Sequence, residues 1–159
     1  HCNTKSEPCD RWLQSGNPVN GLNVDANFGV SVALVGRGGT VLAVGDSNAA
    51  VVRLFDKDGS KWVQRGEALK GPTDSYFGVS ISLSSGESEN VMMNEYSSPT
   101  VTLAVAASTS VVRVYKCPKR GCEPIGSDII FNNSDSFSVS LSFHSLRVYA
   151  SHDIYPDFR

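Results

Sequence analysis

Apolar and polar residues alternate with a period of two over several short stretches of the chain, which is the pattern of half-buried β-strands. Residues 28–34 (FGVSVAL) and 77–83 (FGVSISL) show this pattern, and the short apolar stretches that follow them are rich in β-branched side chains. Glycine, asparagine and aspartate occupy the segments between them, as is typical of turns. No stretch has the 3.6-residue period of an amphipathic helix. The sequence therefore predicts an all-β protein.

The predicted strands belong to an internal repeat, which limits the choice of fold. Residues 12–16 (WLQSG) match residues 62–66 (WVQRG), about 50 positions later. Residues 25–34 (DANFGVSVAL) match residues 74–83 (DSYFGVSISL). A third, shorter copy includes FSVSL at residues 137–141. Each complete copy predicts four strands, with the sequences Phe-Gly-Val-Ser, Leu-Ala-Val, Val-Val-Arg and Trp-x-Gln in that order.

Four antiparallel strands in about 50–60 residues are the content of one β-propeller blade. We assign the end of a preceding blade to 1–16, a blade to 17–66, a blade with an inserted loop (85–99) to 67–126, and an incomplete blade to 127–159. A β-sandwich could also hold a dozen short strands, but it does not require residue-by-residue repetition. Because such a partial propeller cannot close a ring, we expect further segments or copies to complete it. We also expect the polypeptide to extend on both sides.

The strand sequences together resemble the FG-GAP-like repeats of integrin-α-type β-propellers. They resemble most the extracellular variant with an added Trp-x-Gln-x-Gly strand, and the resemblance covers about residues 10–151. It implies a propeller that adheres, binds protein partners or builds extracellular structures. Many members of this family carry an acidic calcium loop between the first two strands, but residues 35–40 and 84–89 lack clustered carboxylates. We therefore expect no cofactor, and we interpret residues 56–59 (DKDG) as a hairpin turn and not as a calcium site.

The four cysteines fall into two close pairs, Cys2 with Cys9 and Cys117 with Cys122. Three pairings are open to four cysteines, and we predict the two local disulfides because each closes a short, turn-rich loop. A metal site is the alternative, but neither pair has CxxC spacing or nearby histidines. Disulfides indicate an oxidising compartment, and Asn132 begins an N-glycosylation sequon. We expect an extracellular or cell-surface protein.

Composition and motifs exclude several classes of function. A net charge of −2 gives no basic face for nucleic acid, and no apolar run is long enough to span a bilayer. The sequence has no Gly-x-Ser-x-Gly elbow and no phosphate loop followed by a helix. The three histidines share no motif. We therefore expect that the protein is not an enzyme.

Some residues are candidates for contact with a protein partner or a glycan. Arg53 and Arg113 recur at one position of the repeat, and so do Trp12 and Trp62 (residue pairs that a repeated framework also explains). Tyr76 and Tyr96 lie outside the repeat pattern, and Tyr96 falls in the inserted loop, the kind of segment that often carries function. We predict that these two tyrosines, like the repeated residues, are contact residues.

The function that these features favour is that of a non-catalytic extracellular structural or adhesion protein that acts as a protein-interaction scaffold. A carbohydrate-binding, lectin-like propeller is an alternative, which the repeated tryptophans and arginines would serve. A second alternative is an accessory, non-catalytic segment of a larger secreted enzyme.

Overall fold

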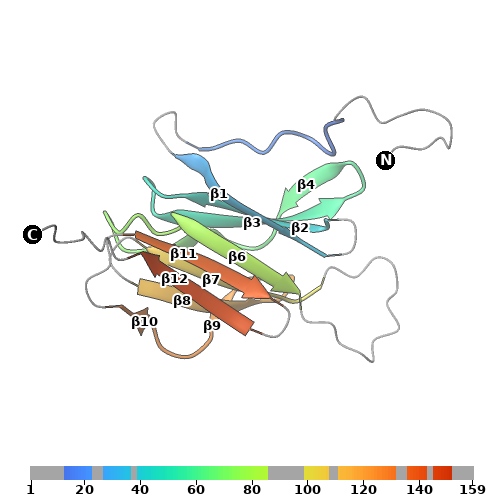
Figure 1. Cartoon of the computed structure of the whole chain (residues 1–159). Helices are drawn as coiled ribbons and strands as arrows, with labels where there is room; N and C mark the ends of the chain where they lie inside the picture. Colours follow the sequence, from blue (N-terminus) through green and yellow to red (C-terminus); the bar gives the residue numbers. More distant parts are fainter. Residues whose placement is uncertain are drawn as a thin grey trace, which may run out of the picture.

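The computed structural model describes residues 13–22, 27–36, 39–85, 99–107, 111–131, 136–142 and 145–151. These residues form strands joined by turns and contain no helix, which confirms the all-β prediction. Three antiparallel sheets follow one another along the chain (Figure 1), and in the described residues they do not close on one another.

The first sheet contains the four strands that the repeat predicts, in a simple meander. It has the order β1 (Phe28–Val35), β2 (Val41–Asp46), β3 (Val51–Asp58) and β4 (Lys61–Gln64), and β5 (Leu69–Lys70) also pairs with β3. The tip of the hairpin between β3 and β4 is formed by Gly59 and Ser60, where Gly59 has a φ of 56° that suits glycine. The DKDG segment is thus a hairpin turn, as predicted.

The second sheet repeats this arrangement. It contains β6 (Ser80–Ser85), β7 (Val101–Ala107), β8 (Val111–Cys117) and β9 (Glu123–Pro124), and β10 (Ile129–Ile130) pairs with β8 as β5 pairs with β3. The third sheet is a hairpin of β11 (Ser136–Ser142) and β12 (Ser145–Ser151). We call two residues equivalent when they hold the same register position in two sheets or the same position in the sequence repeat. Arg53, opposite Val44, is then equivalent to Arg113, opposite Val105.

The core lies between the sheets, which pack face to face. β6 lies against β1 and β2 of the first sheet, and β11 lies against β6 and β7 of the second. The main cluster unites one face of the first sheet with the facing side of the second, and its side chains include Val41, Ala43, Val52, Leu54, Ile81, Leu83, Leu103, Val105 and Tyr115. Full burial of a Val or Leu side chain contributes about 1.5–3 kcal/mol. Because side chains alternate between the two faces of a strand, the other face of the first sheet does not take part in this cluster.

Candidate functional site

The seam between successive sheets is built from a serine that recurs in the repeat. The Ser31 hydroxyl of β1 donates to the carbonyl oxygen of Gly78, at 2.6 Å, in the segment that enters β6. The equivalent Ser80 hydroxyl accepts a hydrogen bond from the backbone N–H of Val139 in β11, at 3.2 Å. The hydroxyl at this position of the repeat therefore contacts the backbone of the next sheet in both copies, as a donor at Ser31 and as an acceptor at Ser80.

Glycine lets the two backbones approach closely at this seam. Gly78 has a φ of +90°, and a Cβ added there would lie 2.9 Å from Val52 Cγ2 and 3.4 Å from the Cα of Gly45. The equivalent Gly29 has a φ of +91°, but an added Cβ would meet no atom of the described residues within 4 Å. The same positive φ therefore occurs twice, and within the described part of the chain a neighbouring sheet lies against the second copy alone.

Two aliphatic side chains of β1, Val32 and Leu34, form an exposed row that we call the β1 stripe. Their exposed fractions are 63% and 59%. The residues equivalent to Val32 and Leu34 in β6 are Ile81 and Leu83, which are only 7% and 8% exposed because the first sheet covers them. The β1 stripe is thus a surface whose counterpart in the next sheet is an interface.

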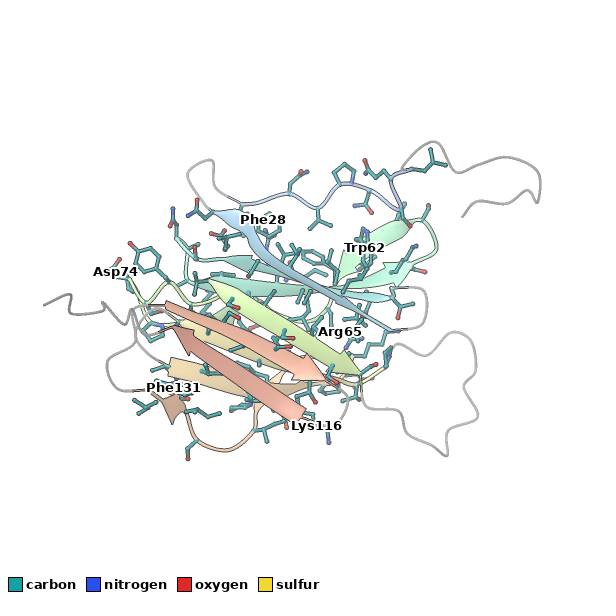
Figure 2. The ribbon with its side chains drawn as sticks, in the orientation of Figure 1. Phe28, Trp62, Arg65, Asp74, Lys116 and Phe131 are labelled. Carbon is teal, nitrogen blue, oxygen red and sulfur yellow. A yellow bond between two sulfur atoms is a disulfide. The ribbon has the colours of Figure 1, made fainter. Side chains whose placement is uncertain are left out.

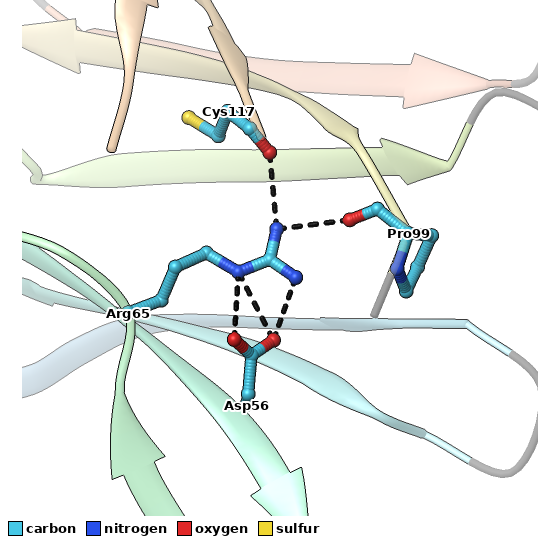
Figure 3. Close-up of polar contacts among 4 residues, drawn as sticks. All are labelled: Asp56, Arg65, Pro99 and Cys117. Carbon is cyan, nitrogen blue, oxygen red and sulfur yellow. Dashed lines mark hydrogen bonds and ion pairs between the residues drawn. The ribbon is translucent and has the colours of Figure 1, made fainter. Parts of the chain in front are cut away.

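The connection that leads from the first sheet to the second carries an arginine clamp (Figure 3). Arg65 donates to both carboxylate oxygens of Asp56, at 2.6–3.1 Å, within the first sheet. Its Nη1 donates to the carbonyl oxygens of Pro99, just before β7, and of Cys117, at the end of β8, each at 3.0 Å. The side chain of Arg65 is fully buried and lies between the two large sheets (Figure 2). The clamp therefore ties the two sheets together.

Sequence reasoning did not identify this clamp. Arg65 is equivalent to Ser15 in the WLQSG copy, where the Ser15 hydroxyl accepts a hydrogen bond from Lys57 Nζ at 2.6 Å. Lys57 is in turn equivalent to Cys117. Ser15 and Arg65 thus each contact the same position of the sheet that follows them, Lys57 or Cys117. Ser15 does so through a hydroxyl and Arg65 through a guanidinium. The only signal in the sequence was the departure of Arg65 from the repeat.

The two repeated arginines, which were predicted contact residues, have different surroundings. Arg53 is only 5% exposed, with its Cζ 4.3 Å from the ring centroid of Phe28, and it donates to the Asn20 carbonyl at 2.9 Å. This guanidinium is engaged within the fold by a cation–π contact and a hydrogen bond. Arg113 is half-buried and donates instead to both carboxylate oxygens of Asp128, at 2.6 and 2.5 Å.

A small pocket lies beside the Arg113–Asp128 pair. It has a volume of about 110 Å³, and Phe77, Val105 and Ala107 are among its lining residues. Phe77 is equivalent to Phe28, the ring that Arg53 covers in the first sheet. Arg113 is turned toward Asp128, so the second sheet keeps an open pocket beside this ring.

The Arg113–Asp128 pair changes the titration of its members and of a neighbouring tyrosine. Hydrogen bonding from Arg113 lowers the pKa of Asp128, and the Asp128 carboxylate raises the pKa of Arg113. Burial raises the pKa of Tyr115, and Arg113 opposes that shift. Because about a third of each side chain in the ion pair is exposed, solvent screens the interaction.

The disulfide between Cys117 and Cys122 is present as predicted. Its cysteines hold the positions of Lys57 and Trp62, which face each other across β3 and β4. In the first sheet, Trp62 packs its ring over Gly16 and donates its indole N–H to the Ser15 carbonyl, at 3.1 Å. Trp62 and the disulfide therefore close the same hairpin, and the geometry of Trp62 is that of a packing residue.

Other predicted contact and modification residues are placed as follows. Tyr76 is half exposed and has a φ of 48°, in the turn before β6. The remaining predicted positions lie outside the described residues, namely Cys2, Cys9, Trp12, Tyr96 and Asn132.

Searches for metal-binding groups, membrane spans and similar proteins add three findings. Among the described residues, no cluster of three or more His, Cys, Asp or Glu side chains could hold a metal ion. The same part of the chain contains no helix with the length and apolar character needed to cross a membrane. The chain matches no protein-family model, no curated protein and no solved structure.

Proposed function

We propose that this chain is part of a β-propeller-like repeat array that acts as a non-catalytic, extracellular structural or adhesion scaffold for protein partners. The observation that carries the proposal is the repeated seam, in which the hydroxyls of Ser31 and Ser80, at the same position of the repeat, each hydrogen-bond the backbone of the next sheet's first-strand segment. A fold that adds sheets through one recurring contact presents many similar surfaces, and such surfaces suit binding more than chemistry.

Three further features support this proposal. The first two sheets each contain four consecutive antiparallel strands, which is the strand content expected of a blade, and β6 lies against both β1 and β11. The Cys117–Cys122 disulfide is typical of secreted proteins. The β1 stripe offers an apolar surface of the kind that marks protein–protein contact.

The proposal is tested by isolating the protein from its source under native conditions and determining its mass and its neighbours. We expect it in a stable extracellular assembly with other proteins or further copies. Recovery as a free monomer without neighbours would contradict the proposal. The same preparation, tested for hydrolysis of glycosidic, ester and peptide bonds, should be inactive.

A further inference from the structure

Residues 13–20 share two local features with residues 63–70, which contain the last strands of the first sheet, although residues 13–20 form no strand and pair with none among the described residues. Gln14 Nε2 donates to the Gly16 carbonyl at 2.9 Å, and Gln64 Nε2 donates to the Gly66 carbonyl at 3.1 Å. Both glycines have positive φ, +95° and +61°. In the first sheet, the corresponding residues 63–70 pair with β3. Residues 13–20 therefore have the local Gln–Gly geometry of the segment that follows β3, with no strand in the place of β3 among the described residues.

The β1 stripe points to the same missing neighbour from a second direction. Its equivalents in β6 pack on a face formed by Val41, Ala43, Val52 and Leu54 of the first sheet. Among the described residues nothing lies beside Gly29, whereas Gly45 and Val52 lie beside the equivalent Gly78. The β1 stripe, Gly29 and residues 13–20 are three separate observations. The equivalent of each one contacts a neighbouring sheet or strand in the structure.

We propose that the β1 stripe and residues 13–20 together bind one more sheet of this same repeat type, which this chain completes by supplying the sheet's last strands. The partner sheet presents a small aliphatic face like that of Val41, Ala43, Val52 and Leu54, with a glycine where Gly45 stands. Its first strand carries a serine that donates to the Gly29 carbonyl, as Ser31 donates to Gly78. Its third strand, of the Val-Val-Arg type, pairs with residues 13–20.

This inference rests on the proposed scaffold function and names the partner of one of its surfaces. A generic partner would need only to cover apolar side chains. The likeness of residues 13–20 to residues 63–70, which pair with β3, adds a requirement for β-sheet pairing, which an exposed hydrophobic patch alone does not make. The glycine opening at Gly29 adds a requirement for close backbone approach.

The test compares carbene footprinting of the protein isolated from its source with that of the 159-residue chain alone. Peptides that contain residues 13–20 and 30–34 should be labelled in the chain alone and protected in the source protein. Cross-linking mass spectrometry should join residues 13–22 to a peptide with a Val-Val-Arg-type strand. Equal labelling in both samples would overturn the inference.

A pair of variants separates this inference from the proposed function. Expressed in the source, Val32→Asp should weaken retention of the repeat-containing partner more than about tenfold, because a charge in an apolar interface costs well over 1.4 kcal/mol. Val63→Asp, at another exposed apolar position, should retain the partner. Protection by a protein without this repeat would overturn the inference and leave the scaffold function standing. A monomer without any neighbour would contradict both.

Discussion

The first and second sheets have the same strand order, yet their equivalent faces have opposite surroundings. Ile81 and Leu83 of the second sheet are covered by the first, whereas Val32 and Leu34 of the first sheet are exposed. The polar contacts differ as well. Arg53 of the first sheet is buried over the ring of Phe28, whereas the equivalent Arg113 of the second sheet donates to the carboxylate of Asp128. Repetition thus fixes the backbone frame and leaves the side chains at each seam free to diverge.

The Arg65 clamp has the largest expected effect on stability, because its guanidinium is fully buried and bonded to both large sheets. The second sheet has no such clamp, since Lys116 and Ile125 stand at the positions equivalent to Asp56 and Arg65. Arg65→Met should lower the free energy of unfolding by about 3–5 kcal/mol, since it leaves Asp56 and two carbonyl groups without this buried partner. Urea unfolding followed by circular dichroism measures this loss. Arg120→Met, at an exposed site, is the matched control and should change little. A loss below about 1 kcal/mol would show that the clamp is not a major tie between the sheets.

The equivalent residues Ile81 and Val32 should respond very differently to truncation. Ile81→Ala should cost about 2–4 kcal/mol, because it leaves a cavity between the first two sheets. Val32→Ala should remain within about 0.5 kcal/mol in the isolated chain, because its side chain is 63% exposed. Equal losses in the same urea titrations would contradict the difference in burial between the two faces.

Removal of the Cys117–Cys122 disulfide tests how much it stabilises the β8–β9 hairpin. In the first sheet the equivalent β3–β4 hairpin has Lys57 and Trp62 at these positions. The double substitution Cys117→Ala and Cys122→Ala should lower the free energy of unfolding by about 2 kcal/mol, by restoring the freedom of a short loop to the unfolded chain. Reduction of the original protein with dithiothreitol is the control, and it should produce a loss in the same direction. An unchanged unfolding midpoint after both treatments would exclude a stabilising role.

The Arg113–Asp128 pair has the smallest expected effect, below about 1 kcal/mol, because both side chains are partly exposed. Since Arg113 depresses the pKa of Asp128 in the folded state, the pair stabilises the protein above the unfolded pKa of the carboxyl group. That contribution is lost as the pH falls through the folded pKa. Unfolding titrations across the acid range should show this loss in the original protein.

Asp128→Asn supplies the control for this pH dependence and a structural readout. The variant should lose less stability on acidification than the original protein, because it has no carboxyl group at position 128 to protonate. Arg113 should then move over Phe77, as Arg53 lies over Phe28, which NMR would detect as upfield ring-current shifts of the Arg113 side-chain protons. An Arg113 spectrum that does not change would show that the carboxylate is not what holds this side chain away from the ring.

The strands were predictable because alternation and repetition are local properties of the sequence. The meander of β1 to β4, the turn at Gly59 and the Cys117–Cys122 pair all followed from residues close together in the chain. The sequence also marked Arg53 and Arg113 as equivalent, but their different partners depend on Asn20 and Asp128, which lie outside the strand pattern.

The Arg65 clamp could not be predicted for a related reason. Its partners lie on two sheets, and two of them are backbone carbonyl groups, at Pro99 and Cys117, which no side-chain pattern reveals. The exposure of the β1 stripe was equally hidden, because Val32 and Ile81 have the same place in the repeat. Only the packing of the sheets distinguishes a covered face from an open one.

Methyl NMR with a soluble gadolinium relaxation agent is the most direct test of the claim that one face is covered and its equivalent is open. The methyl signals of Val32 and Leu34 should broaden strongly in the isolated chain, whereas those of Ile81 and Leu83 should be nearly unaffected. Similar broadening of all four residues, or protection of all four, would contradict the account.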